Sequence, residues 1–133
     1  MIIKNIELFT FQAGWNEWSF IKLDTDNDIS GWSECTDTFK NLNGFSGILK
    51  DFKNLILDED PINIKRIVWK LETKTKSSPG SLIQRVISAI ENALWDINGK
   101  VKNLPVHSLI GEKLRDQIEI YWSHCGTTRV RSS

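Results

Sequence analysis

The sequence predicts an α+β domain, in which a three-stranded antiparallel meander at the N-terminus packs on a helical set. Three observations support this fold class. Within residues 2–35, apolar and polar side chains alternate in three short runs, which is typical of half-buried strands. Residues 48–71 then carry apolar side chains at helical spacing, and residues 81–100 carry the longest such stripe. Strands followed by helices favour an α+β plan.

The three strands are expected at residues 2–11, 18–23 and 29–35. In the first strand, Ile6 and Leu8 share one face while Phe9 and Phe11 fall on the other, as a period of two requires. Residues 24–28 contain three aspartates and an asparagine, which suit a turn between the second and third strands. One face of this meander needs a helical cover to be stable.

Two shorter helices are expected between the meander and the long helix, over residues 48–56 and 64–71. Asp60 is interpreted as the N-cap of the second one, and Pro61 as its first helical residue. Proline is tolerated at that position because its missing N–H would have no partner there anyway.

The long helix is expected to run from Ser81 to Lys100. Ser81 and Gln84 have the spacing of a capping box, and Asn98-Gly99 is a common helix ending. Ile87, Ile90 and Leu94 of this helix are expected to be nearly buried. Residues 117–122 alternate again and are expected to form a strand with no partner nearby in the sequence.

Composition excludes several classes of protein. The chain has 133 residues, 40% of them hydrophobic, which fits one domain with a core of its own. Seventeen basic residues balance seventeen acidic ones, so no strong field favours nucleic acid or an anionic membrane. No signal peptide and no membrane span are expected. Cys35 and Cys125 are far apart and lack CxxC spacing, which favours reduced thiols and a cytoplasmic location.

Several segments together resemble one known family. The stretch SAIENALWDINGK is followed by Leu-Pro-Val at 104–106, Leu-Ile-Gly at 109–111 and Leu-Arg-Asp at 114–116. The segments MIIKNIELFTF and FIKLDTDNDISGWSEC precede it in the same order. This combination resembles the N-terminal capping domain, with the connector to the barrel, of the mandelate racemase/muconate lactonizing enzyme branch of the enolase superfamily. The resemblance covers essentially the whole chain.

The resemblance implies a division of the chain. Residues 1–116 would be the capping domain, and residues 117–133 would be the start of a TIM-like barrel, with its first strand and the following loop only. The barrel itself is expected to be absent, because it takes about 250 residues. The sequence ends with no closing element after residue 126, which favours a truncated family member. The alternative is a free-standing, non-catalytic binding or interaction domain.

The resemblance also implies an activity for the full-length parent. Enzymes of this family abstract the proton α to a carboxylate, and a divalent metal stabilises the enediolate. The metal ligands and the bases come from later barrel strands, so no catalytic residue and no metal ligand is assigned to this chain. The parent is expected to be an Mg²⁺-dependent acid-sugar dehydratase or a related racemase, and the chain alone is expected to be inactive.

Two loops of the capping domain are expected to cover the substrate, at residues 12–18 and 36–45. The residues that we assign to this lid are Trp15, Asn16, Glu17, Thr36, Asp37, Thr38 and Phe39. The alternative is that they are ordinary solvated loop residues. Tyr121, Ser123 and His124 are candidates for the pocket rim, where the first barrel strand would end, and the alternative is an inert strand end. The expected partners are an acid-sugar or related carboxylate substrate and further copies of the chain, with no nucleic acid and no membrane.

Overall fold

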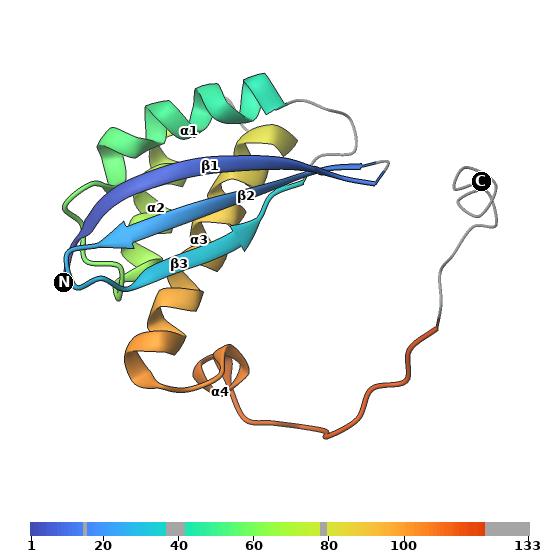
Figure 1. Ribbon diagram of the computed structural model, residues 1–133. Coiled ribbons are helices and arrows are strands. Elements are labelled where there is room, and N and C mark those ends of the chain that lie inside the picture. The colour runs from blue at the N-terminus through green and yellow to red at the C-terminus, as the bar shows by residue number, and fades with distance from the viewer. Residues whose placement is uncertain (15, 37–41, 78–79, 122–133) are drawn as a thin grey trace.

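The computed structural model describes residues 1–14, 16–36, 42–77 and 80–121 (Figure 1). Its elements are, in order, β1 (Ile3–Ala13), β2 (Asn16–Thr25), β3 (Ser30–Glu34), α1 (Leu42–Ile56), α2 (Ile64–Lys74), α3 (Ser81–Lys102) and α4 (Val106–Ile110). The strands form one antiparallel sheet in the order β1-β2-β3, and α1, α2 and α3 cover one of its faces. The predicted α+β fold is confirmed.

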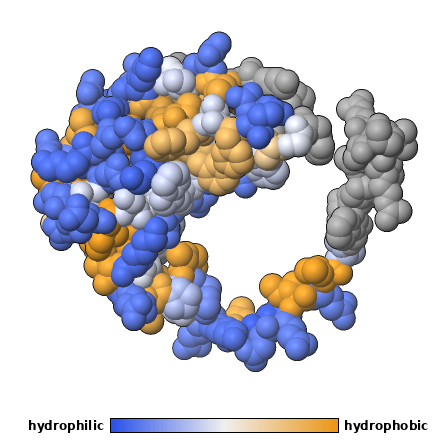
Figure 2. Space-filling view, in the orientation of Figure 1, coloured by the Kyte–Doolittle hydropathy of each residue, from blue (hydrophilic) through white to orange (hydrophobic). Residues whose placement is uncertain are grey.

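The alternation along β1 and β2 separates the two faces of the sheet. Ile6 and Ile21 point to the helices and are buried, whereas Phe9 lies opposite Phe20 on the outer face. The outer face is lined with aromatic rings: Phe11 stacks on Phe20 at 5.7 Å between ring centroids, and Phe9 lies 5.4 Å from Trp32. Figure 2 looks onto this face and shows apolar side chains gathered among hydrophilic ones.

The long helix α3 is the centre of the core. Ile87, Ile90 and Leu94 are at most 3% exposed, so their predicted burial is confirmed. The helix lies across the backs of β2 and β3, and it approaches Gly31 of β3 closely. A Cβ on Gly31 would lie only 2.1 Å from the carbonyl oxygen of Ala93. The absence of a side chain at Gly31 therefore allows β3 to rest directly on the helix.

Side chains of α3 also close the free edge of β3. The Trp32 N–H donates to Asp96 Oδ2 at 2.8 Å, and Lys100 Nζ donates to the Ser30 carbonyl at 2.6 Å. Lys100 and Asp96 are themselves paired at 2.7 Å. An edge strand with unpaired backbone groups invites pairing with other chains. The helix satisfies two of these groups and so protects the edge.

The predicted end of α3 is two residues short, because the helix continues to Lys102, and Asn98-Gly99 is not its ending signal. The Asn98 side chain is buried and donates to the carbonyls of Leu94 and Pro61, both at 2.9 Å, so it is satisfied inside the helix. Asn103, at φ 51°, adopts the left-handed conformation that ends the helix.

The predicted starts of α2 and α3 also need correction. The N-cap of α3 is Gly80, which makes no side-chain cap hydrogen bond, and Ser81 is already helical, so the predicted capping box of Ser81 and Gln84 does not form. The helix α2 begins at Ile64, not at Pro61. The Asp60 carboxylate instead accepts hydrogen bonds from the Ile62 N–H and the Asn63 side chain, which holds a turn before the helix.

The expected loop at residues 12–18 is a tight hairpin instead. Gln12 pairs with Glu17 and Ala13 with Asn16, so the β1–β2 ladder extends almost to its tip. Gly14, at φ +63°, supplies the left-handed residue that the turn requires. Most of the predicted loop therefore belongs to the sheet.

The expected strand at the C-terminus is wrong for the part that the structure describes, residues 117–121. These residues lie in no strand, and Ile118 and Ile120 are 72% and 92% exposed. A strand needs a neighbour for its backbone groups, and the chain beyond α4 runs away from the sheet (Figure 1).

Among the described residues, no helix has the length and apolar character to cross a membrane.

Candidate functional site

The two segments predicted to cover a substrate begin at the same end of the sheet. The tip of the β1–β2 hairpin and the end of β3 lie together there (Figure 1). Glu17 is half-buried at the start of β2, next to Asn16, whose backbone is part of the same strand. Trp15, Asp37, Thr38 and Phe39 lie outside the described residues.

Thr36 joins this end of the sheet to the long helix. The Cys35 N–H donates to the Ser19 carbonyl at 2.8 Å, and the Ser19 N–H donates to Thr36 Oγ1 at 3.2 Å. From the other side, Arg85 Nη2 of α3 donates to the Thr36 carbonyl at 2.9 Å. Thr36 is thus bonded to β2 through its side chain and to α3 through its backbone.

A polar pocket of about 350 Å³ lies beside this junction of Thr36 with β2 and α3. Its lining residues come from the end of β3 and one face of α3: Glu34, Cys35, Thr36, Gln84, Arg85, Ser88, Ala89 and Asn92. Burial raises the pKa of the Cys35 thiol to about 12, although the charge of Arg85 acts in the opposite direction. Burial thus disfavours the thiolate, which is the nucleophilic form of a cysteine.

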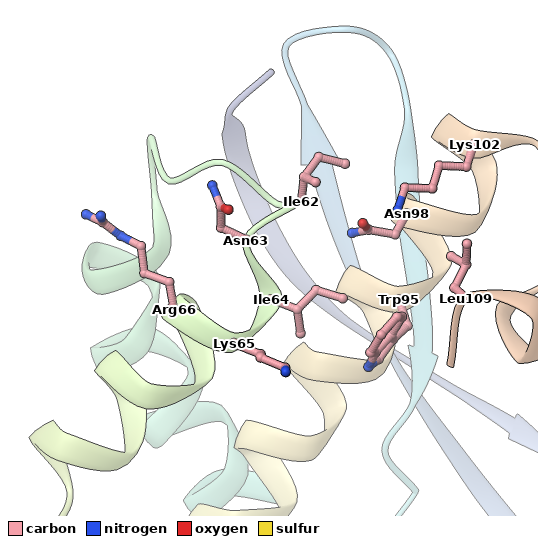
Figure 3. A pocket seen from close by; sticks show the side chains of 9 residues that line it. All are labelled: Ile62, Asn63, Ile64, Lys65, Arg66, Trp95, Asn98, Lys102 and Leu109. Carbon is pink, nitrogen blue, oxygen red and sulfur yellow. The ribbon is translucent and has the colours of Figure 1, made fainter. Parts of the chain in front are cut away.

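A second pocket, of about 450 Å³, lies where the start of α2 meets α3 and α4 (Figure 3). Lys65 reaches toward Trp95 across the pocket, whereas Arg66 points away from it. Lys102 also lines the pocket, which is therefore basic and contains no carboxylate among its lining residues. Its lining residues on α3, from Trp95 to Lys102, lie 10 to 17 residues from Arg85, which corresponds to roughly 15–25 Å at 1.5 Å per residue. This pocket is separate from the hairpin end of the sheet.

Arg66 and Lys70 turn toward Glu59. Lys70 Nζ donates to Glu59 Oε1 at 2.6 Å, and Arg66 Nε lies 3.3 Å from Oε2. The hydrogen bond from Lys70 lowers the pKa of Glu59 from its ordinary value of 4.5; partial burial opposes this, and the charges of Lys70 and Arg66 add to it. The folded state therefore gains stability from ionised Glu59 above about pH 4.5 and loses it as the pH falls through the lowered pKa.

We accordingly expect Glu59→Gln to destabilise the domain clearly at pH 7 and much less at pH 3. Urea unfolding at the two pH values measures the difference, with Glu72→Gln, an exposed substitution on the same helix set, as the control. An equal loss of unfolding free energy at both pH values would show that Glu59 does not act through its charge.

Metal binding is not supported by the described residues. No group of three or more His, Cys, Asp or Glu side chains converges among them. They therefore do not fit the Mg²⁺ ion that the family resemblance implies, and we assign it no ligand in this part of the chain.

Of the candidates for the pocket rim, Tyr121 is 87% exposed, while Ser123 and His124 fall outside the described residues. The other histidine, His107, is exposed on α4.

The comparisons with known proteins decide the family. Residues 8–111 match the N-terminal domain model of mandelate racemase / muconate lactonizing enzyme. The chain belongs to this family. The expectation drawn from the helix, the connector and the two strand segments is thus confirmed, and the fold is that of an enolase-superfamily N-terminal domain.

Relatives of this capping domain include enzymes that act on sugar acids. D-Galactonate dehydratase from Variovorax paradoxus is 30% identical over 119 residues, which is 90% of this chain and 31% of the relative. Among solved structures, an enolase from Agrobacterium radiobacter, a candidate galactarate dehydratase bound to Na and L-malate, has a TM-score of 0.83 at 30% identity. It matches 91% of this chain and 30% of that protein.

A second solved structure is a candidate L-alanine-DL-glutamate epimerase from Burkholderia xenovorans, bound to magnesium and fumarate. It has a TM-score of 0.89 at 33% identity, over 96% of this chain and 32% of that protein. The chain thus spans about a third of the length of these relatives.

Two residues of the junction were not among the sequence-based candidates. Ser19 and Arg85 lie 17 and 49 residues from Thr36 in the chain, and only the fold brings them together. Ser19 sits in an ordinary strand pattern, and Arg85 on the polar side of an amphipathic helix. No local motif marks either of them.

Proposed function

We propose that residues 1–116 form the capping domain of an Mg²⁺-dependent enzyme that removes the proton α to the carboxylate of an acid sugar, most simply in a dehydration. Residues 117 onward would begin the barrel that carries the metal ligands and the bases. The observation that carries the proposal is the similarity to D-galactonate dehydratase, which extends over 90% of the chain. The catalytic groups are assigned to the barrel because the described residues contain no metal-binding cluster.

In this proposal the capping domain covers the bound substrate. The β1–β2 hairpin tip and the segment that begins at Thr36 start from one end of the sheet, so both can reach a single site next to it. Covering segments of this kind exclude water and shape the distal part of a pocket. Glu17, Asn16 and Thr36 would supply polar groups to the sugar hydroxyls.

Other assignments remain predictions. Trp15 would contribute an aromatic wall, and Asp37, Thr38 and Phe39 would complete the second segment. Tyr121, Ser123 and His124 would lie at the rim of the barrel. A homo-oligomer and a cytoplasmic location also remain predictions, based on the resemblance and on the two widely spaced cysteines.

A substrate panel tests the proposal. The full-length enzyme that contains residues 1–133 is incubated with D-galactonate, galactarate and further aldonates and aldarates, with Mg²⁺ or with EDTA. We expect Mg²⁺-dependent formation of the dehydrated product from at least one acid sugar, and no turnover by residues 1–133 alone. Micromolar, one-to-one Mg²⁺ binding by the isolated chain, or a full-length protein that leaves every acid sugar unchanged, would contradict the proposal.

A further inference from the structure

We infer that Arg85 is a positioning residue for the substrate-covering edge, by which we mean the β1–β2 hairpin together with the end of β3. Through Thr36 it holds the β1–β2 hairpin and the end of β3 as one unit on α3. The inference rests on the proposed function for its relevance to a substrate. Its structural part concerns three hydrogen bonds among described residues and can be tested without a substrate.

The three hydrogen bonds run in series. Arg85 Nη2 donates to the Thr36 carbonyl at 2.9 Å, Thr36 Oγ1 accepts the Ser19 N–H at 3.2 Å, and the Ser19 carbonyl accepts the Cys35 N–H at 2.8 Å. Ser19 lies two residues from Glu17, in the arm of β2 that leads to the hairpin tip. The series therefore connects the helix to both expected covering segments through one residue, Thr36.

The helix end of this series is firmly anchored. Val86 and Ile87, which follow Arg85, are buried in the core, so the backbone at Arg85 cannot shift without disturbing the sheet–helix contact. A guanidinium donating to a carbonyl makes a charge-assisted hydrogen bond, stronger than one between neutral groups. Arg85 is thus a rigid reference point for Thr36.

The sheet end of the series depends on Thr36 being held. Ser19 is only 4% exposed, and its N–H bonds to the Thr36 hydroxyl rather than to another strand, because β3 ends at Glu34. If Thr36 turned away, a nearly buried donor would lose its acceptor, which is costly. The hairpin arm and the residue after β3 should therefore loosen together.

Amide hydrogen exchange on residues 1–133 tests this coupling. The variants are Arg85→Met, which keeps an unbranched apolar stem but removes the guanidinium and its donors, Thr36→Val, which replaces the hydroxyl by a methyl group of similar size, and Arg85→Lys, which keeps a cationic donor. Gln84→Ala, at the neighbouring exposed position in the same pocket wall, is the matched control.

We expect Arg85→Met and Thr36→Val each to speed exchange of the Trp18 and Ser19 amides by about tenfold, the effect of losing one hydrogen bond. Exchange of the Ile6 and Leu23 amides should change by less than about twofold, and Arg85→Lys should restore part of the protection. Unchanged exchange at Trp18 and Ser19, or equal acceleration at all four amides, would overturn the positioning role.

A second measurement separates this inference from the proposed function. In the full-length enzyme, Arg85→Met should raise KM for the acid sugar by about tenfold while kcat changes less than about threefold, because the bases lie elsewhere. If exchange changes as expected but KM does not, Arg85 positions the edge and the edge does not contact the substrate. If no acid sugar is turned over, the proposed function fails, and the exchange result still decides the coupling.

Discussion

Gly31→Ala is expected to destabilise the domain by roughly 3 kcal/mol or more, although it adds a single methyl group. The new Cβ would lie 2.1 Å from the Ala93 carbonyl oxygen and 2.7 Å from Cγ1 of Ile97. A flexible side chain could move aside, but the Ala93 oxygen belongs to the backbone of α3. The strand and the helix must therefore separate, which disturbs packing on both sides of this contact.

Gly47→Ala is the matched control for this substitution. Gly47 lies inside α1, and a Cβ there would meet nothing within 4 Å. Alanine at an unobstructed helical position should be neutral or stabilise the domain by up to about 1 kcal/mol. Urea unfolding of the two variants gives the comparison. Similar unfolding free energies for Gly31→Ala and the wild type would show that β3 does not rest on α3 as described.

Leu94→Ala is expected to cost about 2–5 kcal/mol of unfolding free energy. Leu94 is 0% exposed and lies in the middle of the buried stripe of α3, so its removal leaves a cavity between the helix and its neighbours. Domains of this size have a total stability of about 5–15 kcal/mol. The variant should therefore melt well below the wild type, and the unfolding free energy that it loses should be a large share of the total stability of the domain.

The control for Leu94→Ala is Leu114→Ala, the same chemical change at a residue that is 90% exposed. It should alter the unfolding free energy by no more than about 0.5 kcal/mol. Thermal melting followed by circular dichroism measures both variants. If Leu94→Ala melts with the wild type, the assignment of the buried stripe is wrong.

Much of the fold could be predicted because its determinants are local and periodic. The stripe of α3 and the alternation of β1 and β2 both follow from residue spacing, and both are confirmed by the burial of Ile90 and Ile21. The family could likewise be identified from short segments in their order, and the matched residues 8–111 confirm it.

The element ends were predicted less well, because they depend on contacts made after folding. Asn98 is normally a helix-ending residue, but Pro61, 37 residues away, accepts a hydrogen bond from it and keeps it inside α3. The pairing of β1 with β2 continues to Ala13 and Asn16, although the mixed composition of residues 12–18 did not indicate strands there. For residues 117–121, the alternation was visible, but a partner strand is needed to turn it into structure.

The candidate site, like the fold, could be predicted only where position along the chain was enough. Position alone could nominate Glu17 and Thr36, since Glu17 precedes the predicted second strand and Thr36 follows the predicted third strand. The contacts of Thr36 could not be predicted, since Ser19 and Arg85 come from different elements and carry no motif. Likewise, the close approach at Gly31 depends on where α3 lies against β3.

The most direct test of the central claim is a crystal structure of the full-length enzyme with Mg²⁺ and an acid sugar, or an inert analogue of one. The claim is that this domain covers the substrate while the chemistry takes place on the barrel. We predict that polar atoms of the hairpin tip or of Thr36 lie within hydrogen-bond distance of the sugar hydroxyls, about 2.7–3.2 Å, and that every metal ligand comes from residues beyond the capping domain. A substrate bound with the hairpin and Thr36 more than about two such distances away, or a metal ligated by residues 1–116, would contradict the account.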